Sequence, residues 1–400
     1  MEKIELNRVI LVKYGELTTK KSNRSLFVNA LYNNLLNKFK GLNVNITKDL
    51  SRMLIEFEDK DLSVILSKIN TVFGIHAYDV AYKVPSNISD ISDLLKNIVN
   101  DYDFKSFKVV TKRSDKSFPI ESPLFSKRMG GVILKNKANV MVDVHNPEIT
   151  FNIEIRRDFT YIYTNEYRGI GGYPVGTLGK GLLMLSGGID SPVSGYLAMK
   201  RGISISAVYF EAIPHTSIEA RNKVITLTKK LLNYTNNIDL YIVPFTKIQE
   251  AIYKNIPDTY TITIMRRMMY RIMEKLVIKY KAHVIINGES IGQVASQTLT
   301  SMQVINNVTN LPVIRPLACF DKLEIIDIAK KIDTYETSIL PYEDCCTVFV
   351  PKHPVINPCL DKCILYEQSI DYQEMIDEAI NNIIKINVNE INEEKFSDVL

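Results

Sequence analysis

The sequence contains no tryptophan, only five cysteines and only five histidines in its 400 residues. All five cysteines lie in the last quarter of the chain, which excludes the evenly spread disulfide framework of a small secreted domain. The histidines are scattered, and no pair has the spacing of metal ligands. Clustered cysteines without such a framework are typical of redox, sulfur or metal chemistry in a reducing compartment.

The chain also lacks a long apolar run and a strong excess of charge. No stretch of eighteen apolar residues occurs, which argues against a membrane span, and the first residues lack the apolar core and cleavage site of a signal peptide. We therefore expect a cytoplasmic protein. The formal net charge of +4 is too small to indicate nucleic-acid binding by itself, but it permits a local basic face.

Hydrophobic periodicity divides the chain into three blocks and a tail. Residues 1–60 read as strand, basic loop, helix and strand, which suits a small α+β domain, and residues 61–168 alternate helices with strands. Residues 169–176 form a Gly-rich linker. Residues 177–375 alternate short apolar strands with helices, which predicts an α/β domain with a parallel sheet. The tail, residues 376–400, is expected to be helical.

The most specific motif is the loop Ser186-Gly187-Gly188-Ile189-Asp190-Ser191, which lies between an apolar strand and a helix that starts near Pro192. Its glycines let the backbone approach a ligand closely, and its N–H groups, together with the helix dipole, favour an anion. The P-loop and Gly-x-Gly-x-x-Gly patterns are absent. Asp190 would repel a phosphate unless Mg²⁺ or hydrogen-bond donors lie between them.

This loop resembles the PP-loop of ATP pyrophosphatases, and residues 185–192, with the Gly-rich linker before them, resemble tRNA 4-thiouridine synthetases. Other segments agree with that family in chain order, over about residues 5–360. Residues 14–24 resemble its ferredoxin-like domain, and residues 107–119 and 142–148 resemble its THUMP RNA-binding domain. Matches in the catalytic block are Met265–Met269, Asn287–Gln297 and Asp344-Cys345-Cys346.

The resemblance implies an ATP site with Mg²⁺ at the carboxyl ends of the parallel strands, where α/β folds bind ligands. Arg266 would hold charge that develops on the leaving pyrophosphate, whereas Arg267 reads as part of a solvated helix face. Gly288 would let adenine or ribose approach. The residues implied in ATP binding are Met184, Leu185, Ser186, Gly187, Gly188, Asp190, Ser191, Tyr209, Phe210, Arg266, Gly288 and Gln297.

Three residues are expected to be catalytic: Asp190, Lys322 and Cys345. Lys322 is predicted at a helix start, where a cation opposes the helix dipole, so we expect it to contact phosphate or substrate. A thiolate or persulfide is a strong nucleophile, and Glu343-Asp344-Cys345 matches the setting of the family's persulfide-bearing cysteine. Cys346 is the second candidate for this role.

The other cysteines leave alternatives open. Cys345, Cys359 and Cys363 could supply three thiolates to an iron–sulfur cluster, as in some tRNA thiolation enzymes. We favour a resolving thiol that forms a disulfide with Cys345, either Cys346, Cys359 or Cys363, or an external reductant. Cys319, between Ala318 and Phe320, is expected in the core.

Basic residues concentrate in the two N-terminal blocks, which carry no catalytic motif. Each cluster alone would be read as a solvated face, but their concentration favours a platform for RNA phosphates. The candidate RNA-binding residues are Lys20, Lys21, Arg24, Lys112, Arg113 and Lys116.

Together these expectations describe an ATP-dependent tRNA sulfurtransferase. O4 of uridine 8 in tRNA is adenylated, and sulfur from a Cys345 persulfide replaces it to give 4-thiouridine. The resemblance also implies sulfur supply for the thiazole of thiamine. The chain ends at Leu400 without the family's C-terminal rhodanese domain, so we expect a cysteine desulfurase to donate sulfur directly; a homodimer is left open.

Three alternatives are weighed against this function. One is a PP-loop tRNA thiolase that uses an iron–sulfur cluster. The second is an RNA-binding protein that acts only in thiamine sulfur transfer. The third is a PP-loop ligase or amidotransferase that does not use RNA.

Overall fold

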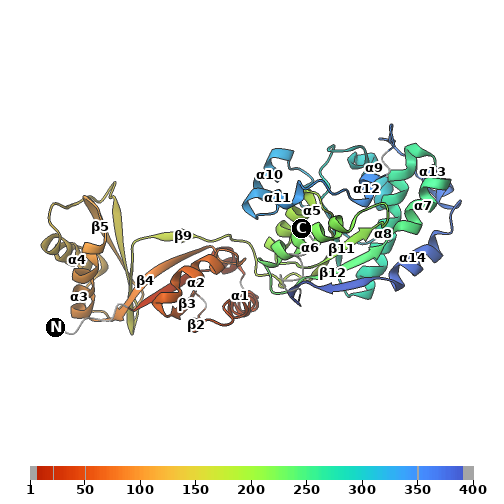
Figure 1. Cartoon of the computed structure of the whole chain (residues 1–400). Helices are drawn as coiled ribbons and strands as arrows, with labels where there is room; N and C mark the ends of the chain where they lie inside the picture. Colours follow the sequence, from red (N-terminus) through yellow and green to blue (C-terminus); the bar gives the residue numbers. More distant parts are fainter. Residues whose placement is uncertain (1–6, 21, 50, 349–350, 391–400) are drawn as a thin grey trace. The chain divides into compact units, whose positions relative to one another are not determined.

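The computed structural model of the protein describes residues 7–20, 22–49, 51–348 and 351–390 (Figure 1). The chain divides into two compact units, Met1–Gly171 and Gly172–Leu400, and each is described by itself. In the described part of the chain, we find no helix with the length and apolar character needed to cross a bilayer.

The first unit is built on a nine-stranded sheet in the order β2-β3-β1-β4-β8-β7-β5-β6, with β9 paired to β4. Strand β1 pairs antiparallel with both β3 and β4, whereas β5 pairs parallel with β6 and β7. The strands are β1 (Arg8–Lys13), β2 (Val44–Lys48), β3 (Arg52–Phe57), β4 (Ala77–Pro85), β5 (Ser106–Arg113), β6 (Met141–Val142), β7 (Ile149–Ile155), β8 (Phe159–Tyr163) and β9 (Glu166–Arg168).

The helices of this unit bury regularly spaced apolar faces against the sheet. In α3 the buried residues Ile91, Leu94, Leu95 and Ile98 have the i, i+3, i+4, i+7 spacing of one helix face. Asn87 caps this helix by accepting the N–H of Asp90. The helices are α1 (Arg24–Lys38), α2 (Leu62–Ile69), α3 (Ile88–Ile98) and α4 (Ser122–Asn136), with 3₁₀ turns η1 (Gly15–Thr19), η2 (Asp59–Asp61) and η3 (Val99–Asp101).

The second unit contains a six-stranded sheet in the order β14-β13-β10-β11-β12-β15. The first five strands are parallel, and β15 pairs antiparallel with β12 at the edge. This confirms the predicted α/β fold with a parallel sheet. The strands are β10 (Lys180–Met184), β11 (Ser204–Glu211), β12 (Asp239–Pro244), β13 (Val284–Ile286), β14 (Val313–Ile314) and β15 (Ile384–Asn387).

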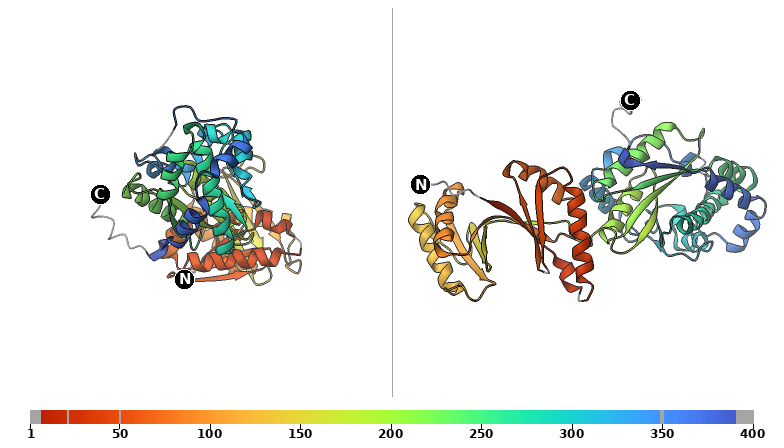
Figure 2. Two further views of the ribbon diagram at one scale, coloured as in Figure 1. Left: turned by 90° about the vertical axis from the view of Figure 1, so that its right-hand side faces the viewer. Right: turned by 90° about the horizontal axis from the view of Figure 1, so that it is seen from below.

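Helices cover both faces of this sheet (Figure 2). Leu182 and Met184 of β10 join the apolar core formed with α7, α8 and α14, whereas Leu183 lies against α5, near Gly195. The helices are α5 (Asp190–Lys200), α6 (Ile218–Leu232), α7 (Thr246–Asn255), α8 (Thr261–Lys279), α9 (Leu299–Asn306), α10 (Lys322–Lys331), α11 (Tyr335–Ser338), α12 (Cys345–Val348), α13 (Leu360–Glu367) and α14 (Tyr372–Asn381), with 3₁₀ turns η4 (Asp258–Tyr260), η5 (Ala295–Gln297) and η6 (Val388–Glu390).

The helical tail expected over 376–400 is wrong in part. Helix α14 ends at Asn381, and Ile384–Asn387 forms the edge strand β15. The segment alternates isoleucine with a polar residue, which suits a half-exposed strand better than a helix. Residues 391–400 lie outside the described residues. The domain boundaries expected within the first unit stay predictions, because one continuous sheet runs through it.

Arg267, which reads as part of a solvated helix face, is instead 1% exposed within α8. Its Nε and Nη2 donate to both carboxylate oxygens of Glu367 at 2.7 and 2.9 Å, and its Nη1 donates to the carbonyl of Val304. Arg271 also donates to Glu367. This ion pair joins α8 to α13 inside the core, where a lone charge would be costly.

We therefore expect Arg267→Met to lower the free energy of unfolding by about 3 kcal/mol, because it leaves a buried Glu367 without its main partner. The double variant Arg267→Met/Glu367→Leu should recover most of this loss. Urea unfolding followed by circular dichroism measures both. Lys275→Met breaks the exposed pair with Asp377 and should cost less than about 1 kcal/mol; equal losses for both single variants would contradict the prediction.

Candidate active site

The Ser186–Ser191 loop joins β10 to α5 at the carboxyl edge of the second sheet, near its centre. The two serines bond the loop to itself. The N–H of Ser186 donates to Ser191 Oγ at 2.9 Å, the two hydroxyls lie 3.1 Å apart, and the N–H of Gly188 donates to Ser186 Oγ at 3.3 Å. In this arrangement the hydroxyls fix the shape of the loop.

Asp344, which is distant in sequence, is hydrogen-bonded to the backbone of this loop. Both of its carboxylate oxygens accept the N–H of Gly187, each at 3.0 Å. Burial raises the pKa of Asp344 above its ordinary value, although the Gly187 N–H, the charge of Lys223 and the Ser186 hydroxyl act in the opposite direction. A carboxylate therefore occupies a loop N–H group that could hold a phosphate.

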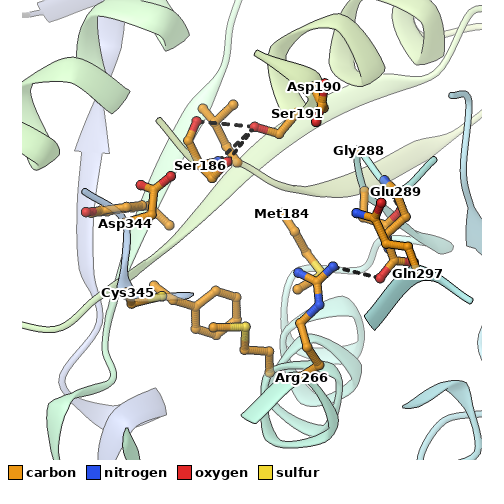
Figure 3. A pocket seen from close by; sticks show the side chains of 15 residues that line it. Met184, Ser186, Asp190, Ser191, Arg266, Gly288, Glu289, Gln297, Asp344 and Cys345 are labelled. Carbon is orange, nitrogen blue, oxygen red and sulfur yellow. Dashed lines mark hydrogen bonds and ion pairs between the residues drawn. The ribbon is translucent and has the colours of Figure 1, made fainter. Parts of the chain in front are cut away.

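A cavity of about 190 Å³ opens at this edge of the sheet (Figure 3). It brings together the loop, the ends of β10 and β11, helix α8 and the segment after β13. Gly187 and Gly188 belong to the same loop but do not line the cavity. The lining residues are Met184, Leu185, Ser186, Asp190, Ser191, Tyr209, Phe210, Arg266, Met269, Asn287, Gly288, Glu289, Gln297, Asp344 and Cys345.

Glu289 is the central carboxylate of one wall, and sequence reasoning assigned it no role. It is 1% exposed and accepts hydrogen bonds from Arg266 at 2.8 Å and Arg315 at 2.7 Å, while Tyr270 lies 3.3 Å away. Burial alone would raise the pKa of Glu289, but the two guanidinium groups outweigh it and the pKa is lowered. Glu289 therefore stays charged and fixes Arg266 at the cavity (Figure 3).

Gly288 has a structural reason for lacking a side chain. A Cβ at this position would lie 2.8 Å from the carbonyl carbon of Asp190 and from the nitrogen of Ser191. The segment after β13 thus packs directly on the first turn of α5. The expected approach of adenine or ribose to Gly288 stays a prediction, but contact with α5 already requires glycine.

Gln297 presents an unsatisfied acceptor to the cavity. Its side chain is 7% exposed, and its Oε1 has no hydrogen-bond partner in the described part of the chain. A buried amide oxygen without a partner is costly, so a ligand donor, such as an exocyclic amino group, fits there.

Asp190 and Lys322, both expected to be catalytic, form an ion pair. Lys322 Nζ lies 2.5 Å from Asp190 Oδ1, and Gln293 donates to Asp190 Oδ2 at 2.8 Å. Lys322 is the first residue of α10, as expected, and Asp321 and Glu324 form a capping box there. The repulsion expected between Asp190 and a phosphate is thus reduced by two donors.

Cys345 begins α12 and is 5% exposed while lining the cavity. Its carbonyl accepts Gln249 Nε2 at 2.7 Å. The expectation that Cys319 lies in the core is wrong, because Cys319 is exposed in the turn after β14. Its apolar neighbours Ala318 and Phe320 are themselves only partly buried.

The remaining cysteines differ in environment. Cys363 is fully buried in α13, and burial raises the pKa of its thiol to about 11, whereas Cys359 is exposed. The side chain of Cys346 lies outside the described part. Among the described residues, no three His, Cys, Asp or Glu side chains gather as metal ligands; the iron–sulfur alternative stays untested.

Comparison with known proteins places these features in a family. Residues 9–78 match the ThiI ferredoxin-like domain, residues 85–165 match the THUMP domain, and residues 176–372 match the thiamine biosynthesis protein ThiI. A solved 4-thiouridine synthetase, in complex with RNA and with bound ATP, is 35% identical over 95% of this chain and 99% of its own, with a TM-score of 0.89. The chain belongs to the 4-thiouridine synthetase (ThiI) family. PH1313 from Pyrococcus horikoshii Ot3 is 22% identical over 82% of this chain and 99% of its own, with a TM-score of 0.64, and shares the fold.

The candidate RNA-binding residues of this ThiI family member lie in different environments. Arg113 Nη1 donates to the carbonyls of Phe118 and Ile120, so it orders its own loop. Lys20 lies over the ring of Phe27, and Arg24 is half-buried. Lys112 and Lys116 are exposed, and Lys21 lies outside the described residues.

Lys112 joins a basic groove that sequence reasoning missed. The groove holds about 440 Å³, and four of its side chains are cationic. Arg52 and Arg156 are held by Glu154, whereas Arg157 is exposed. No sequence motif marked these arginines, because Arg52 lies in β3 while Arg156 and Arg157 lie about a hundred residues later, in the loop between β7 and β8. The groove is lined by Ser51, Arg52, Lys112, Ser114, Asp115, Glu154, Arg156 and Arg157.

The packing of Gly288 on α5 generates a prediction. We expect Gly288→Ala to lower the free energy of unfolding by about 1–3 kcal/mol, because its Cβ would overlap the backbone of Asp190 and Ser191. The same shift should displace the loop and weaken binding of an ATP analogue. Thermal unfolding and titration calorimetry measure the two effects. Gly131→Ala is the control, since no atom lies within 4 Å of its added Cβ in α4; a Gly288→Ala variant as stable as this control would refute the packing argument.

Proposed function

We propose that this protein is an ATP-dependent tRNA sulfurtransferase that adenylates O4 of uridine 8 in tRNA and replaces that oxygen with sulfur to give 4-thiouridine. The observation that carries the proposal is the presence of the phosphate-type loop and Cys345 in one cavity. Membership of the ThiI family, and a relative in complex with RNA and with bound ATP, support it.

The cavity suits ATP. Met184, Phe210 and Met269 offer an apolar wall for adenine, and Gln297 Oε1 offers an acceptor for its amino group. The loop N–H groups and Arg266 would then receive phosphates, since backbone donors at a helix start and a guanidinium both bind phosphate oxygens. Arg266, held by Glu289, would neutralise charge on the departing pyrophosphate.

Asp190 would serve as a Mg²⁺ ligand, because its carboxylate lines the cavity, where the ion would take the place of the Lys322 ammonium that now pairs with it. With phosphate oxygens it would form the oxygen-rich shell that Mg²⁺ prefers, and the ion would supply neutralising charge. Lys322 itself can orient Asp190 or donate to a phosphate oxygen.

The sulfur step uses Cys345. A cysteine desulfurase would place a second sulfur on its thiol, as a persulfide. The terminal sulfur attacks C4, the C4–O4 bond breaks, and O4 leaves with AMP. A resolving thiol then attacks Cys345 Sγ, which releases 4-thiouridine and leaves a disulfide for reduction by an external thiol.

Among the resolving candidates, the exposed Cys359 is more accessible than the buried, high-pKa Cys363. Cys346 stays a candidate. The same persulfide would serve the thiazole of thiamine, a role that the name of the matching family model supports. A cytoplasmic location agrees with tRNA as substrate.

Cys345→Ala should lower 4-thiouridine in tRNA by at least about 10³-fold, because it removes the sulfur carrier. Release of pyrophosphate from ATP in the presence of tRNA should persist, since adenylation does not need the thiol. Mass spectrometry of digested tRNA and a pyrophosphate assay separate the steps. Cys319→Ala, at an exposed cysteine outside the cavity, is the matched control. Unchanged 4-thiouridine in Cys345→Ala would exclude this mechanism.

We further propose that the basic groove of the first unit contacts tRNA phosphates. Lys112 and Arg157 are its exposed cations, and each phosphate that they neutralise releases counterions. The match of residues 85–165 to the THUMP domain supports an RNA-binding role.

The double variant Lys112→Ala/Arg157→Ala should weaken tRNA binding by about tenfold and lower the slope of log Kd against log salt by about 1–2. Filter binding at several salt concentrations measures both. Lys96→Ala serves as control, because Lys96 is exposed on α3 and pairs with Asp93 outside the groove. If both variants bind tRNA with the same affinity and slope, the groove is not part of the RNA interface.

A further inference from the structure

Three donors, Lys223, Gly187 and Gln249, hold the segment 340–345 in place beside the phosphate-type loop. Lys223 Nζ donates to the carbonyl of Leu340 at 2.7 Å and lies 3.4 Å from that of Tyr342. The Gly187 N–H donates to Asp344, and Gln249 donates to the carbonyl of Cys345. The contacts come from the loop, α6 and α7, so they position the start of α12 with its cysteine.

The absence of a side chain at Gly187 makes the contact between its N–H and Asp344 possible. A Cβ at residue 187 would lie 3.1 Å from Lys223 Cδ and 3.3 Å from Asp344 Oδ1. Such spacing leaves little room for a side chain, so the loop backbone, the Lys223 stem and the carboxylate pack as one unit. Figure 3 shows Asp344 beside Ser186, with Cys345 following on the same side of the cavity.

We propose that Asp344 and an ATP phosphate compete for the Gly187 N–H, so that nucleotide binding displaces Asp344 and releases the segment that carries Cys345. Asp344 is thus a positioning residue that acts through Cys345. This inference rests on the proposed function, because it needs ATP on this loop.

Charge makes the two occupants mutually exclusive. A carboxylate and a phosphate that share one N–H donor at hydrogen-bond distance repel each other in a partly buried site. Lys223 is 6% exposed and lies beside both Asp344 and the loop. When Asp344 leaves, this cation stays beside the loop and can neutralise the incoming phosphate. Lys223 therefore stabilises either occupant, but not both together.

Linkage gives the competition a quantitative form. If closure of the segment weakens ATP binding by some factor, ATP must favour opening of the segment by the same factor. Cys345 is 5% exposed while Asp344 is on the loop, so opening should increase access to its thiol. Nucleotide affinity and thiol accessibility must therefore change together.

The test uses the full-length protein with Cys346→Ser, because Cys345 and Cys346 lie on the same tryptic peptide. The probe is α,β-methylene ATP, whose affinity is measured by titration calorimetry. The rate of Cys345 alkylation by iodoacetamide, with and without the analogue, is measured by mass spectrometry. The analogue should accelerate alkylation in the parent protein by about fivefold or more.

Asp344→Ala should bind the analogue about fivefold or more tightly, and its Cys345 should react fast even without nucleotide. Asp344→Asn keeps the side-chain volume and should shift the affinity for the analogue in the same direction. The test therefore does not depend on the alanine variant alone, which could fold poorly. Glu343→Ala removes a neighbouring exposed carboxylate and should leave affinity and alkylation at parent values.

Two results separate this inference from the proposed function. Lack of analogue binding to the parent protein would contradict the ATP site itself. Binding with unchanged Cys345 alkylation, and equal affinity in Asp344→Ala, would overturn the competition and leave the ATP site standing. Equal gains in analogue affinity in Asp344→Ala and Glu343→Ala would also overturn the competition, since such gains would reflect net charge rather than the contact of Asp344 with Gly187.

Discussion

The loop between β10 and α5 has backbone N–H groups that neither the sheet nor the helix can satisfy, and the residues around it meet that need. Ser191 accepts the first N–H, Asp344 the second and Ser186 the third. A side-chain hydroxyl can stay in place when a ligand binds, but a carboxylate cannot share its donor with a phosphate. The loop backbone is therefore fixed by hydroxyls at Ser186 and Gly188 and exchangeable at Gly187.

The charged side chains of the cavity are compensated by neighbouring residues, as the N–H groups of the loop are. Each of its carboxylates has a cation beside it: Asp190 has Lys322, Asp344 has Lys223, and Glu289 has two arginines. The Glu289 group is buried and satisfied, so it is structural and holds Arg266 in one place. The Asp190 pair is half-exposed and its partners are long, flexible side chains, so it can rearrange around a metal ion or phosphate at small cost.

Sequence patterns predicted much of this arrangement because they depend on local chemistry. Short apolar runs predicted the parallel strands, the stretches between them predicted helices such as α8, and glycine with proline predicted the loop itself. What sequence patterns could not show depends on contacts between distant segments. Arg267 is buried because Glu367, a hundred residues later, meets it, and Gly288 is needed because α5 lies against it.

The same limit explains the cysteines and the basic residues. Cys319 lies between two apolar residues and is exposed in a turn, whereas Cys363 directly follows Lys362 and is buried in a helix. Arg113 donates from Nη1 to two carbonyls of its own loop, and its expected RNA contact stays a prediction, whereas Arg157 is exposed in a groove that no motif marked. A sequence shows how many cationic side chains a protein has, but only the structure shows which of them are already hydrogen-bonded or ion-paired within it.

In the proposed reaction Cys345 faces two opposite requirements, which a residue that changes environment can meet. A thiol that receives sulfur from another protein must reach the surface, while a persulfide that attacks an adenylated base must be shielded from water and other thiols. A rigidly buried cysteine meets only the second requirement. Cys345 packs into the apolar core of the second unit, and the polar contacts of its segment include hydrogen bonds to backbone carbonyls and one exchangeable carboxylate. Apolar packing thus shields the thiol, while the exchangeable contact of Asp344 gives the segment a way to move, a combination that would suit the proposed carrier of a reactive sulfur.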